Sequence, residues 1–124
     1  MAKRKAKKTA RRKSRSTKTR AKTNPKLPKD AATLIVNLRA REGQELLLEA
    51  ELRALVGPTR REQGCLTYDL YRGAELPSSF LLHEVWASRE HHRLHTQTRH
   101  FLRWNARKDA LLASREATFW KQIS

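Results

Sequence analysis

Cysteine is almost absent from this chain, since Cys65 is the only one among 124 residues. A single cysteine excludes an intramolecular disulfide and a cysteine-based zinc site. Long apolar runs are missing as well: none approaches the ~18 consecutive apolar residues of a membrane helix, and the N-terminus lacks the apolar stretch of a secretory signal. We therefore expect a soluble, cytoplasmic protein with no membrane span.

Acidic and aromatic residues are both missing from residues 1–29, which hold 14 of the 28 lysines and arginines. Residues 30–124 contain the other 14 basic residues, all 12 acidic residues and every aromatic residue. A segment as basic and as poor in apolar residues as 1–29 repels itself and cannot bury enough surface to become ordered. We therefore expect a disordered tail and linker over 1–29 and one folded domain over 30–124.

The charge of the tail favours contact with a polyanion. Lysine- and arginine-rich segments bind nucleic acid by releasing counterions, with little sequence specificity. Without an aromatic side chain to stack on bases, the tail is not expected to read sequence. A merely solubilising extension is the alternative interpretation.

The domain shows strand and helix patterns in turn. Alternation of apolar and polar positions indicates strands, whereas Leu48, Leu52 and Leu55 recur at helical spacing. In the second strand, alternation places Leu66, Tyr68 and Leu70 on one face. The predicted elements are strand 33–40, helix 44–61, strand 65–72, strand 80–87, a helical region 89–112 that begins after Ser88 and is broken near 96–98, and strand 116–123.

This β-α-β-β-α-β order predicts an α+β, ferredoxin-like fold, with a four-stranded antiparallel sheet and its helices on one face. The strands carry apolar residues at both odd and even positions, so the face of the sheet without helices must also be shielded from water. A small sheet of this kind commonly packs against a second copy of itself, and we expect a symmetric homodimer.

Four segments of the domain carry a family resemblance. Together, in order and at suitable spacing, they resemble the antibiotic biosynthesis monooxygenase (ABM) domain, which includes small quinol monooxygenase-like proteins. The segments are Leu38-Arg-Ala-Arg-Glu-Gly43, Pro58-Thr-Arg-Arg-Glu-Gln-Gly-Cys-Leu-Thr-Tyr68, His83-Glu-Val-Trp-Ala-Ser88 and Leu94-His-Thr-Gln-Thr-Arg-His-Phe101.

The resemblance implies a dimeric α+β barrel with a pocket between sheet and helices in each subunit. It further implies oxygenation of a small electron-rich phenol or hydroquinone by O₂, with no flavin, metal or other cofactor. The competing hypothesis is a non-catalytic dimeric domain whose basic tail binds nucleic acid or another polyanion.

The third strand supplies one group of candidate site residues. Phe80, Glu84 and Trp86 share one parity and therefore one face. If that face lines the pocket, Phe80 and Trp86 form an apolar substrate-binding wall, and burial would raise the pKa of Glu84 toward that of a useful general base. The alternative is a core tryptophan and a glutamate paired with an arginine.

His95 and His100 are the other candidate catalytic residues, because imidazole changes protonation near neutral pH. The resemblance places both at the mouth of the pocket, and Phe101 is assigned to substrate binding beside them. The alternative is structural: His95 would cap the helix break and His100 would contact a backbone carbonyl. His91 and His95 are four residues apart, but no carboxylate or cysteine pattern completes a metal site, so none is expected.

Asn37 is a further substrate-binding candidate through the resemblance. A haem-degrading branch of this fold uses an asparagine on the first strand, together with a tryptophan and an axial histidine on later helices. Here the corresponding positions hold His95 and Asn105. Haem degradation is therefore not expected, and Asn37 is assigned as a polar pocket group.

Overall fold

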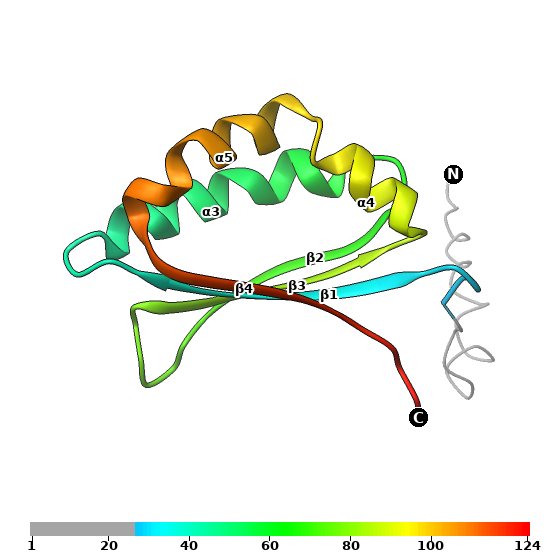
Figure 1. The fold of residues 1–124 in the computed structure, drawn as a ribbon, viewed down its shortest axis with the longest axis horizontal. Helices are drawn as coiled ribbons and strands as arrows, with labels where there is room; N and C mark the ends of the chain where they lie inside the picture. Colours follow the sequence, from blue (N-terminus) through cyan, green and yellow to red (C-terminus); the bar gives the residue numbers. More distant parts are fainter. Residues whose placement is uncertain (1–26) are drawn as a thin grey trace, which may run out of the picture.

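A computed structural model describes residues 27–124 of the chain. The prediction of a disordered tail concerns 1–29, and its residues 1–26 lie outside the described part. The described elements follow one another along the chain as shown in Figure 1: β1 (Ala32–Ala40), α3 (Glu45–Arg60), β2 (Cys65–Arg72), β3 (Ser79–Trp86), α4 (Arg89–His95), α5 (Arg99–Leu111) and β4 (Leu112–Trp120).

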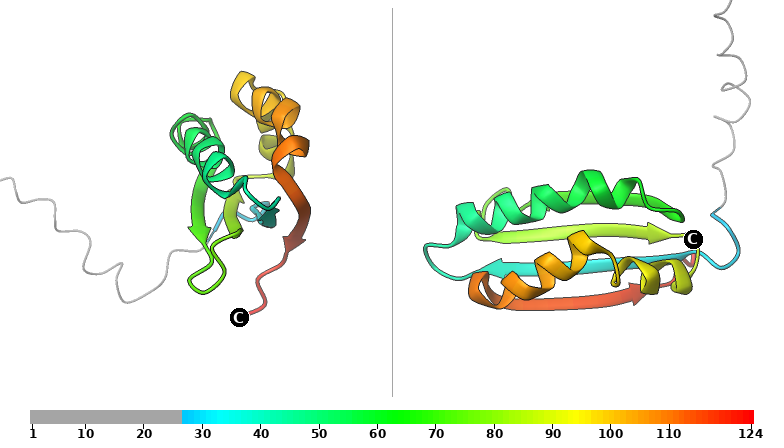
Figure 2. Two further views of the ribbon diagram at one scale, coloured as in Figure 1. Left: turned by 90° about the vertical axis from the view of Figure 1, so that its left-hand side faces the viewer. Right: turned by 90° about the horizontal axis from the view of Figure 1, so that it is seen from above.

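The four strands form one antiparallel sheet in the order β2-β3-β1-β4. The helices α3, α4 and α5 lie on the same face of this sheet, as the end-on view in Figure 2 shows. This arrangement confirms the predicted ferredoxin-like α+β fold. The predicted helical region divides into two helices, α4 and α5, which together stand in the place of the second helix.

The core fills the space between the sheet and the helices. Leu34, Val36 and Leu38 alternate toward the helices, and each is 3% exposed. They pack with three leucines of α3 whose helical spacing predicted the buried stripe: Leu48, Leu52 and Leu55.

One serine and one threonine determine how α4 and α5 begin. The side chain of Ser88 accepts a hydrogen bond from the His91 amide, and that of Thr98 accepts one from the Phe101 amide. Such N-caps satisfy amide groups that the first turn leaves without partners. The predicted helix start after Ser88 and the break over 96–98 are both confirmed.

The prediction for the last strand was wrong in position. We expected helix to residue 112 and a strand over 116–123, whereas β4 begins at Leu112 and ends at Trp120. Residues 112–115 (Leu-Ala-Ser-Arg) suit a helix locally, but their pairing with β1 imposes an extended backbone. Ile123 lies beyond the strand and is 91% exposed.

The prediction for Leu66 was also wrong. The β2–β3 register shifts between Cys65 and Thr67, so Leu66 is an extra residue in a bulge and is 46% exposed. A bulge interrupts the alternation of side chains, and only Tyr68 and Leu70 remain on the inner face with the core.

The opposite face of the sheet carries no helix. Ile35 and Leu81 are half-buried there, while Tyr71 and Trp120 are 54% and 60% exposed. The predicted dimer would cover this face. None of the helices within residues 27–124 has the length and apolar character that a membrane crossing requires.

Candidate active site

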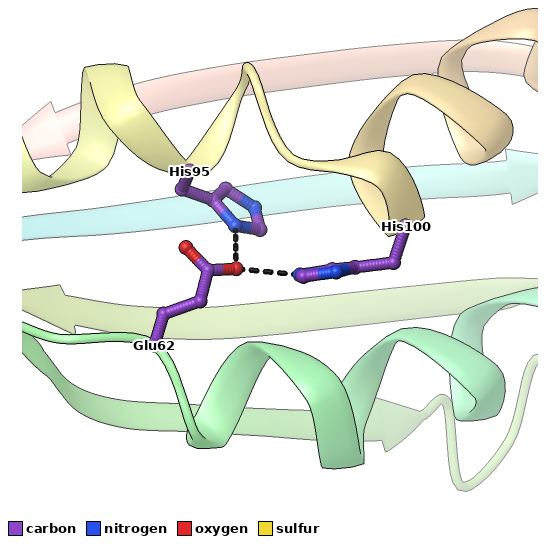
Figure 3. Close-up of side chains that lie close together, drawn as sticks. All are labelled: Glu62, His95 and His100. Atoms are coloured by element: carbon purple, nitrogen blue, oxygen red, sulfur yellow. Dashed lines mark hydrogen bonds and ion pairs between the residues drawn. The ribbon is translucent and has the colours of Figure 1, made fainter.

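Three titratable side chains meet where the helix layer is interrupted. Glu62 follows α3, His95 ends α4, and His100 lies in the first turn of α5. A single carboxylate oxygen, Oε2 of Glu62, lies 2.7 Å from His95 Nδ1 and 2.6 Å from His100 Nε2, as Figure 3 shows. We refer to these residues as the Glu–His–His cluster. The break between α4 and α5 allows both imidazoles to point toward the same carboxylate.

The hydrogen bonds define which ring nitrogens carry protons. A carboxylate only accepts, so His95 donates through Nδ1 and His100 through Nε2. Thr98 Oγ1 also lies 3.3 Å from His100 Nε2. Within residues 27–124, the Nδ1 atom of His100 has no hydrogen-bond partner, which leaves its lone pair available to accept a proton. In the described part of the chain, neither imidazole hydrogen-bonds a backbone carbonyl, which was the alternative, structural contact.

His95 is the buried member of the cluster, with 1% of its surface exposed. Its ring packs among aromatic groups, with centroids 4.8 Å from Trp86, 5.0 Å from Phe101 and 5.8 Å from Tyr68. Burial lowers the pKa of His95, and the hydrogen bond to Glu62 opposes that shift. His95 is therefore held neutral near pH 7, with Glu62 as its polar partner.

Glu84 and Trp86 lie on the inner face of β3, as their parity predicted. The indole Nε1–H of Trp86 donates to Glu84 Oε1 at 3.0 Å, and both residues are buried. Burial raises the pKa of Glu84 to about 7, while the Trp86 hydrogen bond and the charge of Arg115 act in the opposite direction. Within the described residues Glu84 forms no ion pair with an arginine.

The structure brings together only some of the predicted site residues. Phe101 reaches His95, but Phe80 lies six residues from Trp86, about 20 Å along the strand at ~3.3 Å per residue. Asn37 is exposed and pairs with Leu81 and Glu116, so its side chain lies on the helix-free face. Asn37 and Phe80 therefore do not join the Glu–His–His cluster.

A groove of about 310 Å³ runs between α3 and α5 beside this cluster. Its floor contains Leu55 and Trp104, which are each 4% exposed. His100 lines the groove and also contacts Glu62, so it connects the opening to the buried cluster. The groove lies between the helices rather than beneath them. Its lining residues are Glu51, Ala54, Leu55, Pro58, Arg99, His100, Arg103 and Trp104.

Two residues of this region were not predicted as site residues. Glu62 belongs to a segment that carried the resemblance, but nothing in its local pattern pointed to histidines 33 and 38 residues away. Nothing in the sequence distinguishes His92 from the other histidines of its helix. The centroid of the His92 ring lies 5.3 Å from that of Phe119, and burial lowers the pKa of His92 to about 4.

The ligand atoms of the cluster lie within 4.8 Å of one another, which is close enough to surround a cation. Glu62 Oε2, however, occupies the space between the two nitrogens at hydrogen-bond distances. A metal with bonds of about 2.0–2.2 Å would require that carboxylate to move. The geometry fits shared protons better than a metal ion.

Comparisons with known proteins identify the family. The family model described as antibiotic biosynthesis monooxygenase matches residues 31–107, which is most of the domain. The chain belongs to the antibiotic biosynthesis monooxygenase family. This ABM assignment agrees with the resemblance that the sequence segments carried.

Solved and curated ABM relatives extend the comparison. The crystal structure of PA3566 from Pseudomonas aeruginosa aligns with a TM-score of 0.74 and 36% identity, over 77% of this chain and 96% of that one. "Putative monooxygenase Rv0793" from Mycobacterium tuberculosis is 34% identical over 79 residues, covering 64% of this chain and 77% of the relative. Protein sll1783 from Synechocystis sp. is 29% identical over 84 residues, 68% of this chain, and the match spans 57% of the relative's length.

Proposed function

We propose that this ABM domain is a cofactor-independent monooxygenase that acts on a small electron-rich phenol or hydroquinone. The proposal rests on the position of His100: this residue lines the α3–α5 groove, and its Nε2 atom donates a hydrogen bond to Glu62. A basic nitrogen at a groove, supported by a carboxylate, is the arrangement that substrate deprotonation needs. Family membership supplies the reaction class.

The proton transfer assigns a role to each member of the cluster. A phenol in the groove gives its proton to Nδ1 of His100, which converts the ring to an imidazolium. Glu62 accepts from Nε2 and stabilises the positive charge as it forms, as a carboxylate does beside a catalytic histidine. His95 holds Glu62 from the buried side and thus acts as a positioning residue.

The oxygenation balances without an added reductant when the substrate is a hydroquinone. The anion donates electrons to O₂, and one oxygen atom replaces a ring hydrogen. The second oxygen atom leaves as water, and the substrate, having supplied four electrons, ends as a hydroxyquinone. Exclusion of water from the buried side of His95 and Trp86 favours the electron-rich anion chemistry.

Glu84 is the second candidate base. It is 4% exposed and its pKa is raised to about 7 by burial, which suits proton transfer near neutrality. It does not line the α3–α5 groove, however. We therefore assign the leading role to His100 and keep Glu84 as the base if the substrate binds nearer to Trp86.

Oxygen uptake by metal-free protein with a series of phenols and hydroquinones tests the function. On a substrate that is turned over, His100→Gln should lower the rate about 10²–10⁴-fold, the usual contribution of a positioned base. His83→Gln is the matched control, since His83 lies on the helix-free face. Full activity of His100→Gln and His95→Gln would transfer the role to Glu84, and no uptake with any substrate would contradict a monooxygenase.

We also propose a homodimer formed through the helix-free face of the sheet. Its support is the set of apolar side chains that this face leaves open, among them Tyr71 and Trp120. A domain of fewer than 100 residues buries a smaller fraction of its surface than a larger domain does, so association adds core that a single copy lacks.

A second candidate function concerns residues 1–29 and rests on their 14 basic residues and absence of acids. We propose that this segment binds nucleic acid or another polyanion by charge. Affinity for duplex DNA should fall steeply with salt and vary little with sequence. Deleting residues 1–29 should abolish this binding and leave oxygen uptake intact; binding that persists would contradict the assignment to the tail.

A further inference from the structure

The α3–α5 groove carries an arrangement of charge that the proposed proton transfer does not use. Arg99 and Arg103 both line it, and residues four apart on a helix are neighbours on one face. Within residues 27–124 neither guanidinium makes an ion pair or a side-chain hydrogen bond. Arg107, one turn further along α5, pairs with Glu51 instead. The two arginines nearest His100 thus lack a protein anion.

Local electrostatics make this pair unfavourable without a partner. Like charges at i and i+4 destabilise a helix. Arg99 is the first residue of α5, and the first turn contains no acidic residue, so a cation lies at the positive end of the helix dipole. An anion in the groove would relieve both interactions at once.

Glu51 also lines the groove, but its carboxylate is paired with Arg107; apart from His100, the remaining lining residues are apolar and suit a flat ring. Leu55 and Trp104 form its floor, and Ala54 and Pro58 line the α3 side. A volume of about 310 Å³ lies at the lower end of the range for small-molecule pockets, ~300–1,000 Å³. The arginines therefore stand at one side of a surface that can contact an aromatic ring, with His100 beside it.

From this geometry we propose that the groove binds an aromatic anion, a ring that bears a carboxylate, with the carboxylate between Arg99 and Arg103. Guanidinium groups bind carboxylates through paired hydrogen bonds that an ammonium group cannot reproduce. The inference deepens the proposed function, on which it rests, by restricting the substrate to hydroxylated aromatic acids. The acid group anchors the ring, and a neighbouring hydroxyl group faces Nδ1 of His100.

The test measures binding rather than turnover, so that it stands apart from the reaction. Full-length protein is titrated, in the absence of oxygen, with 1-hydroxy-2-naphthoate and with 1-naphthol by isothermal calorimetry at pH 7. These probes share a ring system and a hydroxyl group, but only the naphthoate carries a carboxylate. The naphthoate should bind at least tenfold more tightly.

Variants locate the interaction. Arg99→Gln/Arg103→Gln should weaken naphthoate binding about tenfold or more and leave 1-naphthol within twofold. Arg93→Gln/Lys121→Gln removes the same charge from exposed positions outside the groove and should change neither affinity. Ala54→Trp, which fills the groove from an exposed helix position, should weaken both probes.

Equal affinity for the two probes, or undiminished naphthoate binding by the arginine variant, would overturn the inference. So would an equal loss in the control variant, since that would assign the effect to net charge. Arginine-dependent binding without oxygen uptake by any phenol would support the ligand site and contradict the monooxygenase. If the wild type turned over a neutral hydroquinone and the arginine variant retained that turnover, the result would support the monooxygenase and contradict the carboxylate site.

Discussion

The indole N–H of Trp86 donates a hydrogen bond of 3.0 Å to the carboxyl group of Glu84, two residues earlier on β3. Both side chains point toward the helices, so the bond lies in the core. It gives Glu84 a donor, but burial still dominates and raises the pKa to about 7. The carboxyl group is thus one that takes up a proton within the physiological range.

Glu84 should make stability depend on pH in a defined direction. Its pKa is higher in the folded state, about 7, than its ordinary value of 4.5, so between these values the folded state binds more protons. Its contribution is therefore fully present below about pH 4.5 and is lost as the pH rises to about 7. A shift of this size corresponds to about 3 kcal/mol at most.

Urea unfolding of wild type and Glu84→Gln across pH 4–8 measures this effect. Gln keeps an acceptor for Trp86 and cannot ionise. The variant should be the more stable protein above pH 7, and the difference should shrink toward pH 4.5. A difference that does not change with pH would show that Glu84 titrates normally.

His92 should produce the opposite slope. Burial lowers its pKa from 6.5 to about 4, so the unfolded chain binds more protons between these values. The stabilisation is present above about pH 6.5 and is lost as the pH falls to about 4. His92→Gln should remove part of the acid sensitivity seen in urea unfolding, whereas His83→Gln, on the helix-free face, should retain it.

Glu62→Gln should disturb both histidines at once. Gln presents one oxygen and one donor, so it cannot stabilise an imidazolium as a carboxylate does. We expect a loss of about 1–3 kcal/mol in unfolding free energy, together with changed ¹⁵N shifts of His95 and His100 in NMR spectra. Glu75→Gln is the control, because Glu75 is exposed. Unaltered histidine signals in Glu62→Gln would rule out the shared carboxylate.

Trp86→Ala should cost about 3–5 kcal/mol in unfolding free energy, since the side chain is fully buried. The cavity would adjoin His95, whose ring lies 4.8 Å from the indole. Ile123→Ala, at a position 91% exposed, should leave the free energy within about 0.5 kcal/mol. Chemical denaturation checks both values, and a loss below 1 kcal/mol for Trp86→Ala would contradict its place in the core.

Sedimentation equilibrium of the full chain should show a dimer at micromolar concentration. Leu81→Glu puts a charge on the helix-free face and should give a folded monomer, because an unpaired charge in an apolar interface is costly to desolvate. Leu102→Glu is the control, at a position of α5 that is 52% exposed on the helix layer. A wild-type monomer would refute the barrel.

The sequence pattern predicted those elements that depend on interactions between residues close together in the chain. Leu34, Val36 and Leu38 alternate because one face of β1 is buried, and Ser88 and Thr98 cap helices through their own side chains. These relationships span a few residues and are readable from spacing. Pairing across the sheet, by contrast, overrides the helix propensity of residues 112–115.

In the site, too, the local relationships could be predicted from the sequence and the long-range contacts could not. The shared face of Glu84 and Trp86 follows from strand parity. The same argument places Asn37 on the opposite face, since it stands at an odd position between Val36 and Leu38. The contacts of Glu62 depend instead on how α3, α4 and α5 pack, and no periodicity within the loop after α3 encodes them.

The three residues between α4 and α5 act as a spacer of fixed length. Thr96 ends one helix, Thr98 begins the next, and the imidazoles that share Glu62 belong to different helices. Inserting or deleting one residue here would change the distance and the angle between the last turn of α4 and the first turn of α5, which hold His95 and His100. The length of this connection, independently of its composition, therefore controls whether both imidazoles can reach Glu62. A change of length would leave the sheet intact and separate the two imidazoles.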